Sequence, residues 1–566
     1  MDRHKLDQSI QELQDHKDAW ARLPIPRKMD LLLQTRKRLG ERGDAWVEAS
    51  VRGKQMAPRS PWVGEEWTTG PWVVAAGING YLETLGALSE GHLLKPKKIF
   101  TRPSGQVVAQ VFPNNIFDTL MLNGITAEVW MQPGVTAANL TDHMASFYKQ
   151  KAPTGKVALV LGAGNVTSIS PLDALYRLYA CGHVVILKMS PINDYLGPIL
   201  EYIFAPYVEA GFLRFAYGGA EVGNTLVHHD GVEEVHITGS ARTHDAIVFG
   251  AGAEGAERRR RNDPLINKPI TSELGGVGPT IIVPGKWDKA DVRFQAENVV
   301  TMKLHNNGFN CVASQVLILP ETWAQHDEFL DAVRGLMRTL PPRAAYYPGA
   351  AKRQQEVLAA HPDAELFGGE LPRMLIASVD PNAEQEYSFN NEFFGAVYAE
   401  TNLPGKDTAE YLRNAVRFCN GKLYGTLGAT IIAHPMTMKE LGPALDEAVA
   451  GLRYGSVGIN IWNSAAFLLA QATWGAYPGH TYADIQSGIG VVGNSFLFDK
   501  PEKTVVRGSF YPFPRSWFHG NPTFLPKPPW FITNKTAHTT TMRVARFAAD
   551  PGYRHLPGIL LSALRG

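Results

Sequence analysis

Apolar residues recur at helical spacing in the first part of the chain. Leu6, Ile10 and Leu13 lie three or four positions apart, and the apolar residues of 29–39 repeat with a similar period. These patterns predict amphipathic helices that pack on a larger body. The following segment, 54–72, is rich in Gly, Pro and Trp and is predicted to be a loop.

The pattern changes to that of strands after residue 95. Segments 99–102 and 106–112 flank a Pro-Ser-Gly turn and predict a β-hairpin. Segment 125–131 predicts a further strand, and 141–151 is predicted to be a helix.

Strand-length and helix-length segments then alternate. The predicted strands are 156–161, 183–188, 213–217 and 234–238, and the predicted helices are 170–180, 196–210 and 220–228. Strands separated by helices are typical of βαβ units, which place parallel strands in one sheet with helices on both faces. Right-handed crossovers make this part a doubly wound, Rossmann-like domain of an α/β protein.

A second α/β set covers 280–460 and is followed by an unusual tail. Its predicted strands are 280–283, 316–319, 373–376 and 429–433, with helices at 323–338 and 408–419. After Arg507 the sequence is rich in aromatic residues and proline, which predicts a tail that packs against another surface. The four arginines of 258–261 are flanked by Gly, Asn, Asp and Pro and are predicted to form a solvated surface loop.

The composition excludes several classes of protein. The chain has 566 residues, of which 45% are hydrophobic and 19% charged, so it can bury a large core. A net charge of +1 gives no sign of a nucleic-acid partner, and the histidines show no metal-ligand spacing. Three cysteines do not make a disulfide framework, and no apolar run reaches the roughly 18 residues of a membrane helix. Because the charged N-terminus also lacks a signal-peptide pattern, a cytoplasmic protein is predicted.

One cysteine has the setting of a nucleophile. Cys311 follows the Gly- and Asn-rich stretch 306–310 and precedes the apolar, strand-like run 315–319. A thiolate at the mouth of a turn can attack a carbonyl carbon and later leave it. A buried, inert cysteine is the alternative, because free cysteines are among the most buried residues. Cys181 and Cys419 lie in or beside helical apolar patterns and are interpreted as such packing residues.

Five motifs in a fixed order favour the nucleophile. They are GAGNV at 162–166, ITGS at 237–240, SELGG at 272–276, the Cys311 turn and NEFFG at 391–395. Each is weak alone, but the ordered set closely resembles the aldehyde dehydrogenase superfamily from about 156 to 506. The resemblance implies an aldehyde dehydrogenase-like α/β fold, with a Rossmann-like cofactor domain, an α/β catalytic domain and a bridging, oligomerising element.

The resemblance divides the chain into parts. The expected parts are an N-terminal helical section of the cofactor domain (1–94), a bridging hairpin and possible oligomerisation element (95–150), the Rossmann-like domain (151–273), the catalytic domain (274–460), and a return to the cofactor domain with an aromatic extension (461–566). Members of the family assemble by extending a sheet between subunits, so a homo-oligomer is expected.

The resemblance also implies the catalytic residues. Cys311 stands at the nucleophile position, and Glu273 stands at that of the general base that activates water. The oxyanion of the covalent intermediate is held by a side-chain amide and the backbone N–H of the cysteine. Asn115 and Asn165 compete for the amide role, and Asn165 is favoured because its spacing to Lys188 is the one that the family keeps.

Cofactor-binding residues follow from the same resemblance. Lys188 would contact the adenosine ribose, and Gly239 and Ser240 would hold the pyrophosphate at a helix N-terminus. Glu392 would hold the nicotinamide ribose, and Phe394 would pack near the ring. The expected cofactor is therefore NAD or NADP.

The implied function is NAD- or NADP-dependent oxidation of a small-molecule aldehyde to a carboxylic acid through a Cys311 thioester. NADP is favoured because Pro191 stands where many NAD-preferring members carry a glutamate. Two alternatives stay open: an acyl-CoA or acyl-thioester reductase that forms an aldehyde, and a catalytically inactive structural relative. Glu273 favours the hydrolytic enzyme, because an enzyme that passes its acyl group to CoA needs no base for water.

Overall fold

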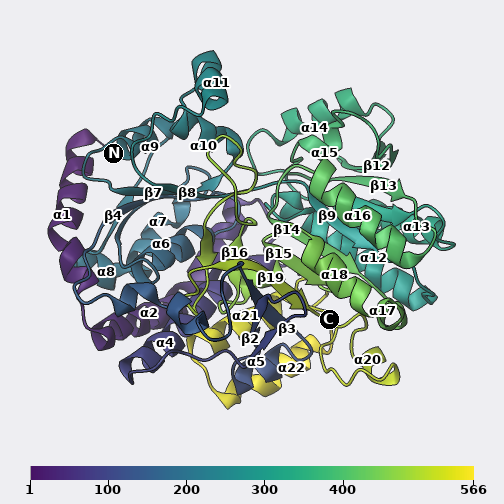
Figure 1. Ribbon diagram of the computed structural model, residues 1–566, viewed down its shortest axis with the longest axis horizontal. Coiled ribbons are helices and arrows are strands. Elements are labelled where there is room, and N and C mark those ends of the chain that lie inside the picture. The colour runs from purple at the N-terminus through teal and green to yellow at the C-terminus, as the bar shows by residue number, and fades with distance from the viewer. Residues whose placement is uncertain (1) are drawn as a thin grey trace.

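Two large β-sheets organise the protein, whose computed structural model describes residues 2–566 (Figure 1). The first sheet has six strands in the order β17-β8-β7-β4-β5-β6. The second has eleven strands in the order β1-β2-β3-β19-β15-β14-β9-β10-β13-β12-β11. Helices cover both sheets, so the α/β class predicted from the sequence is confirmed.

The six-stranded sheet contains the four predicted βαβ strands. β4 to β8 run parallel to their neighbours, and β17 pairs with β8 in the antiparallel direction. The run Val157–Leu161 is apolar throughout, as expected for a parallel strand that is covered on both faces. The strands are β4 (Val157–Leu161), β5 (Val184–Lys188), β6 (Leu213–Ala216), β7 (Glu234–Gly239), β8 (Ile270–Leu274) and β17 (Gly488–Ile489).

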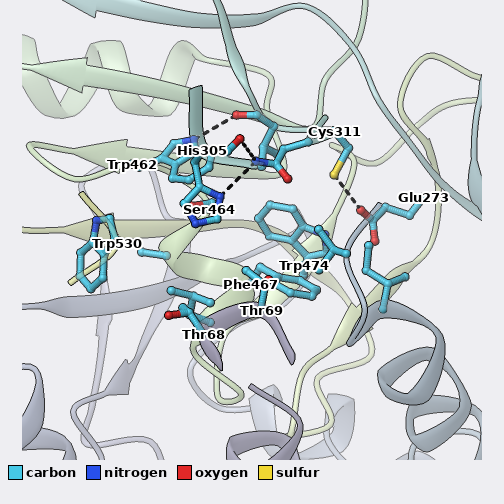
Figure 2. Close-up of a pocket in the computed structure, with 16 residues that line it drawn as sticks. Thr68, Thr69, Glu273, His305, Cys311, Trp462, Ser464, Phe467, Trp474 and Trp530 are labelled. Carbon is cyan, nitrogen blue, oxygen red and sulfur yellow. Dashed lines mark hydrogen bonds between the residues drawn. The ribbon is translucent and has the colours of Figure 1, made fainter. Parts of the chain in front are cut away.

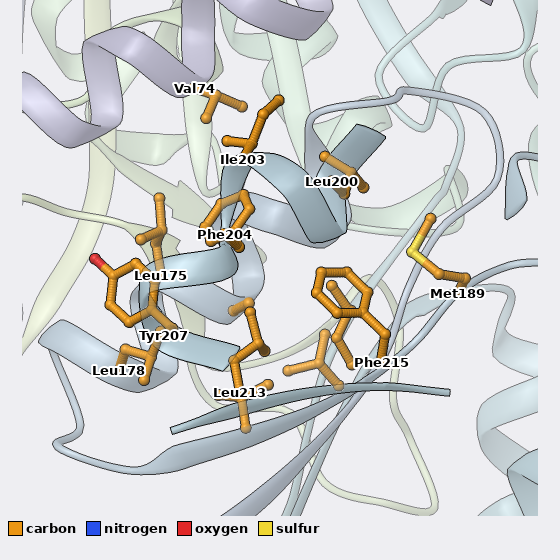
Figure 3. Packing of buried hydrophobic residues seen from close by; sticks show 14 of the residues in the cluster. Val74, Leu175, Leu178, Met189, Leu200, Ile203, Phe204, Tyr207, Leu213 and Phe215 are labelled. Carbon is orange, nitrogen blue, oxygen red and sulfur yellow. The ribbon is translucent and has the colours of Figure 1, made fainter. Parts of the chain in front are cut away.

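Helices of the N-terminal and Rossmann-like parts enclose this sheet. Figure 3 shows their core, where Leu175, Leu200 and Phe204 pack against Leu213 of the sheet. The helices are α1 (Arg3–Ala21), α2 (Ile25–Gly53), α4 (Val73–Ser89), α6 (Ile169–Tyr179), α7 (Gly197–Ile203), α8 (Ala205–Glu209), α9 (Ala220–Val227) and α10 (Ala241–Val248). The single helix predicted for 196–210 is divided at Phe204, because Pro206 lacks the N–H that a continuous helix requires.

The catalytic part of the chain forms most of the second sheet. Its strands are β9 (Gly278–Ile282), β10 (Ser314–Pro320), β11 (Glu365–Phe367), β12 (Arg373–Val379), β13 (Val397–Leu403), β14 (Gly428–Ile432) and β15 (Ser456–Ile459). Its helices are α12 (Lys289–Leu304), α13 (His326–Thr339), α14 (Ala350–Ala360), α15 (Tyr387–Asn390), α16 (Thr408–Lys422), α17 (Pro435–Leu441) and α18 (Pro443–Gly451). The strands and helices predicted for 280–460 are confirmed.

The predicted hairpin joins this second sheet. β1 (Lys98–Thr101) and β2 (Val107–Phe112) pair antiparallel, and β3 (Thr126–Met131) follows the short helix α5 (Ile116–Met121). β3 also pairs with β19 (Pro501–Arg507), and β19 lies parallel to β15. The bridging hairpin therefore extends the catalytic sheet of its own chain.

Two segments differ from the sequence prediction because single residues break the expected pattern. Residues 141–151 do not form a helix but two 3₁₀ turns, Leu140–His143 and Ser146–Lys149. Ala145 between the turns has a left-handed backbone (φ 51°), which a continuous helix does not allow. Segment 54–72 is not a loop throughout, because it contains helix α3 (Val63–Trp67) and a π-helical turn that bends at Gly70.

The arginine run also differs from its prediction. The four arginines end helix α11 (Gly252–Arg261) instead of forming a loop. Glu254 and Glu257 lie one turn before Arg258 and Arg261 and pair with them, so acidic and basic side chains alternate along an exposed helix. Arg260 and Arg261 are exposed, as predicted, whereas Arg258 and Arg259 are half-buried.

The aromatic tail packs on the rest of the protein, as predicted. Phe531 stacks on Phe294 of α12 with ring centroids 5.2 Å apart. The last elements are α19 (Ala465–Leu468), β16 (Thr473–Gly475), β18 (Val491–Gly493), α20 (Arg515–Phe518), α21 (Ala537–Ala549) and α22 (Leu556–Ala563). Within residues 2–566, no helix has both the length and the apolar character needed to cross a membrane.

Candidate active site

Cys311 lies on a tight turn between α12 and β10. The 3₁₀ turn His305–Gly308 contains two left-handed asparagines, Asn306 (φ 52°) and Asn307 (φ 54°). Gly308 (φ 79°) approaches the backbone of Gly395 so closely that an added Cβ would lie 2.3 Å from the Gly395 carbonyl oxygen. These constraints fix the turn against the 391–395 loop and leave the Cys311 thiol half-buried.

Glu273 faces the cysteine from the neighbouring sheet. It lies near the end of β8 and is 2% exposed. The Cys311 Sγ donates a hydrogen bond of 3.5 Å to Glu273 Oε1 (Figure 2), and Oε2 is buried without a protein partner. The thiol and the carboxyl group are therefore close enough to exchange a proton.

The interior shifts the pKa values of both groups upward. Burial, and then the negative charge of Asp173, raises the pKa of Glu273 to about 7. Burial raises the pKa of the Cys311 thiol well above its usual range, and the charges of Glu273 and Glu392 raise it further. The resting cysteine is therefore a neutral thiol beside a carboxyl group whose pKa suits base catalysis near pH 7.

Asn165 is tied directly to the cysteine turn. It lies in the loop after β4, and its Nδ2 donates 2.9 Å to the carbonyl oxygen of Phe309. The backbone carbonyl oxygen of Asn165 accepts hydrogen bonds from Asn306 Nδ2 and the Tyr346 hydroxyl, both at 3.1 Å. The competing Asn115 instead caps α5 and bonds to Glu83 Oε1 at 2.7 Å, so it has a structural role.

All the predicted cofactor and catalytic residues line one cleft. The cleft lies where β4, β5 and β7 end, which is the edge at which doubly wound sheets bind ligands. The predicted residues that it brings together are Asn165, Lys188, Gly239, Ser240, Glu273, Cys311, Glu392 and Phe394.

One end of the cleft is formed by strand ends and a helix start. Lys188 is the last residue of β5, and burial lowers the pKa of its ammonium group. Ser240 caps α10 by accepting a hydrogen bond from Thr243 N at 3.2 Å. Gly239 is exposed, so a ligand can approach its backbone. This end presents a cation and backbone N–H groups, as a phosphate-bearing ligand requires.

The other end of the cleft is organised by Glu392. A Cβ added to Gly275 would lie 2.1 Å from Glu392 Oε1, so only glycine leaves room for this carboxyl group. Burial raises the pKa of Glu392 to about 8, against the opposing charges of Lys303 and Arg353. Oε1 is buried without a protein partner and is free to accept a hydrogen bond from a ligand hydroxyl. These features fit the ribose of a dinucleotide.

Phe394 forms an aromatic wall beside Glu392. Its backbone is left-handed (φ 40°), a strained conformation for a non-glycine residue, and its carbonyl oxygen accepts a hydrogen bond from Arg353 Nη2 at 3.1 Å. The ring lies 4.9 Å from Tyr347 and 5.8 Å from Phe309. The strained backbone therefore directs the ring into an aromatic group at the cleft.

No set of three or more His, Cys, Asp or Glu side chains in 2–566 is arranged to hold a metal ion.

Sequence reasoning missed a buried ion cluster behind the cysteine turn. Lys54 Nζ donates 2.7 Å to Glu66 and 3.1 Å to Asn306 Oδ1. Glu65 accepts from Arg343 at 2.7 and 2.8 Å and from the backbone N–H of Asn306 at 3.0 Å. The cluster therefore holds Asn306, and through it the turn that carries Cys311. The acidic pair lies in 54–72, where the Gly, Pro and Trp content gave no sign of it.

Replacing Arg343 by methionine is expected to destabilise the protein strongly. Burial acts to raise the pKa of Glu65, but the charge of Arg343 lowers it below its usual value, so Glu65 is ionised in the folded protein. Removing one partner of a buried ion pair costs about 3–5 kcal/mol, because the other charge stays buried without compensation. We expect the free energy of unfolding in urea to fall by about this amount.

A surface ion pair provides the matched control. Arg334 pairs with Glu365, whose side chains are 25% and 35% exposed. Arg334→Met is expected to cost less than about 1 kcal/mol, because water screens such a pair. Equal losses in the two variants would contradict a structural role for the buried cluster.

Comparisons with known proteins agree with the motif order. The family model described as "Aldehyde dehydrogenase family" matches residues 81–349. Coniferyl aldehyde dehydrogenase of Pseudomonas sp. is 26% identical over 318 residues, which cover 52% of this chain and 59% of that enzyme. Geranial dehydrogenase of Castellaniella defragrans is 26% identical over 364 residues, which cover 57% of this chain and 67% of that enzyme. The chain thus matches about three fifths of the length of the first of these relatives.

Solved structures show the same fold over most of the chain. NADP-dependent glyceraldehyde-3-phosphate dehydrogenase from Bacillus halodurans, complexed with NADP, has a TM-score of 0.58 at 19% identity and covers 89% of this chain and 91% of that one. Aldehyde dehydrogenase of Mycobacterium tuberculosis, complexed with NAD+, has a TM-score of 0.58 at 19% identity, with 88% of each chain covered. Residues 81–349 thus match the aldehyde dehydrogenase family model, and most of the chain shares the fold of these solved dehydrogenases.

Proposed function

We propose that this protein oxidises an aldehyde to a carboxylic acid with NAD or NADP, through a thioester on Cys311. One observation carries the proposal: the hydrogen-bonded pair Cys311–Glu273 lines both the large cofactor cleft and a separate apolar pocket. An aldehyde bound in the pocket and a dinucleotide bound in the cleft would meet at the sulfur atom.

The first step forms the bond between sulfur and carbon. Glu273 takes the thiol proton, and Cys311 Sγ attacks the aldehyde carbon. The oxyanion that results accepts hydrogen bonds from the backbone N–H of Cys311 and from the Asn165 amide, which is held at the cysteine turn by its bond to the Phe309 carbonyl oxygen. The nicotinamide ring of a bound NAD or NADP supplies the hydride acceptor for the oxidation.

The second step releases the acid. After the thiol proton has passed from Glu273 to solvent, Glu273 takes a proton from water, whose oxygen attacks the thioester carbon, and the C–S bond breaks to return the thiol. The balance is one aldehyde, one oxidised cofactor and one water consumed, and one carboxylic acid, one reduced cofactor and one proton formed. Glu273 serves both steps because its carboxyl group contacts the sulfur and its second oxygen is free.

The absorbance of reduced nicotinamide tests this function. Purified protein is mixed with NAD or NADP and an aldehyde panel, with and without CoA. We expect reduced cofactor to form without CoA and the product to be the free acid. Reduced cofactor that forms only with CoA would instead support the acyl-thioester reductase.

Homo-oligomerisation and a cytoplasmic location stay predictions.

NADP is the cofactor that the cleft favours. Among the described residues that line it, the carboxylates are Glu273 and Glu392, and both lie at the Cys311 end. The opposite end carries Lys188, Ser190 and Pro191, so none of the side chains that line the cleft there is an acid that would repel a 2′-phosphate.

Binding measurements with the two dinucleotides test this preference. We expect NADP to bind at least about tenfold more tightly than NAD, a difference of about 1.4 kcal/mol. Lys188→Met should remove most of that difference. Lys156→Met is the control, because this exposed lysine lies just before the start of β4. It should leave the difference in affinity between NADP and NAD unchanged. Equal affinities of the unmodified protein for NAD and NADP would contradict the preference.

A further inference from the structure

The apolar pocket on the far side of Cys311 has a defined chemistry. It is walled by four large aromatic side chains, Trp462, Phe467, Trp474 and Trp530. Figure 2 shows Cys311 and Glu273 at one end of the pocket and Trp530 at the other. An aldehyde group at the sulfur would therefore place the body of its molecule among these rings.

The pocket offers nothing to neutralise a charged substrate. Among the described residues that line it, the acidic and basic side chains are Glu273 and His305. Burial lowers the pKa of His305, which leaves the ring uncharged at neutral pH, and the ring packs 5.4 Å from Trp462. A carboxylate or an ammonium group on the substrate would lose its water without gaining a partner.

Three polar groups of the walls are already used within the protein, whereas Trp474 Nε1 is buried without a partner. Thr68 and Thr69 donate their hydroxyl hydrogens to the carbonyl oxygens of Gly64 and Glu65, both at 2.8 Å. Trp462 Nε1 donates to the carbonyl oxygen of Val312 at 3.0 Å. The Trp462 ring is thereby fixed beside the cysteine turn. These walls recognise shape and apolar surface.

Trp530 brings the C-terminal tail into the active site. It is 7% exposed, and its neighbour Ile532 is fastened on two sides. The Ile532 N–H donates 3.2 Å to Thr301 Oγ1 of α12, and Trp62 Nε1 donates 2.8 Å to the Ile532 carbonyl oxygen. The tail is thus held rigidly where Trp530 closes the far end of the pocket.

We propose that the substrates are uncharged aldehydes with an aromatic or bulky apolar body, and that Trp530 is a specificity-determining residue for them. The inference rests on the proposed aldehyde oxidation and adds the substrate class. A ring that fills the pocket gains contact with its aromatic walls, of which Trp530 is one, whereas a two-carbon aldehyde covers less of this apolar surface.

The test compares two aldehydes that differ by one charge. Benzaldehyde and 4-carboxybenzaldehyde share the ring, and acetaldehyde serves as the small reference. We expect kcat/KM for benzaldehyde to exceed that for 4-carboxybenzaldehyde at least about 100-fold. Trp530→Ala should lower kcat/KM for benzaldehyde about 10- to 100-fold, chiefly by raising KM. The same variant should keep kcat/KM for acetaldehyde within about twofold of that of the unmodified protein.

An exposed tryptophan of the same tail is the matched control. Trp517 is 48% exposed, and Trp517→Ala should leave all three aldehydes unchanged. Similar kcat/KM values for benzaldehyde and 4-carboxybenzaldehyde, or an equal effect of Trp530→Ala on acetaldehyde, would overturn the inference while leaving the oxidation intact.

A binding measurement separates the inference from the proposed function. Calorimetry with Cys311→Ala requires no turnover and should detect binding of benzaldehyde. Adding Trp530→Ala to this variant should weaken that binding. 4-Carboxybenzaldehyde should not bind in the same way. If this binding pattern holds and no aldehyde is oxidised by the unmodified protein, the proposed function fails and the apolar site stands. If 4-carboxybenzaldehyde binds as well as benzaldehyde, the inference fails.

Discussion

Replacing Cys311 by alanine is expected to abolish aldehyde oxidation. Without the sulfur atom no covalent bond to the aldehyde carbon forms, and the oxyanion donors have no intermediate to stabilise. We expect kcat/KM to fall at least about 10⁴-fold, as for the loss of other nucleophiles. Reduced-nicotinamide absorbance measures the rate, and the affinity for the oxidised cofactor should change by less than about threefold, because Cys311 is only one of many residues that line the cleft.

The other cysteines provide the control. Cys181 lies just after α6, and its sulfur contacts Arg177 Nη1 at 3.7 Å. Cys181→Ala should retain the activity of the unmodified protein. A Cys311→Ala variant that keeps a tenth or more of the original rate would refute covalent catalysis at this position.

Replacing Glu273 by glutamine is expected to lower kcat about 10²- to 10⁴-fold, the usual contribution of a general base. The substitution also removes a negative charge that raises the pKa of Cys311, which eases ionisation of the thiol and offsets part of the loss in the attack step. Release of the acid gains no such compensation. Hydrolysis of the thioester should therefore become the slow step.

The pH dependence of kcat identifies Glu273 as the base. With a pKa of about 7, its carboxyl group is protonated and inactive at lower pH and ionised at higher pH. The unmodified enzyme should therefore gain activity as the pH rises through about 7. Glu273→Gln should lack this rise. If the same limb persisted in Glu273→Gln, another group would be responsible for it.

The site could be located from the sequence because its residues belong to local motifs. Gly239 and Ser240 end a strand and begin a helix, and Cys311 lies on a turn before a strand, so short sequences define their surroundings. Parallel strands then bring such ends to one edge of the sheet. This is why residues as distant in sequence as Lys188 and Glu392 line the same cleft.

The supporting residues could not be predicted because their contacts are non-local. Arg343 and Glu65 are 278 positions apart in the chain, and their pairing leaves no periodic pattern in the sequence. Trp530 reaches the substrate pocket from a tail that was predicted only to pack. The left-handed Ala145 that divides segment 141–151 is also set by tertiary contacts, since its N–H bonds to the carbonyl oxygen of Leu497.

The proposed thioester on Cys311 is tested most directly by peptide mass spectrometry. Glu273→Gln is mixed with benzaldehyde and the oxidised cofactor, quenched in acid and digested. The proposed mechanism predicts one equivalent of reduced cofactor per chain and the added mass of one acyl group, located on the peptide that contains Cys311. Reduced cofactor without an adduct, or an acyl group on any other residue, would contradict it.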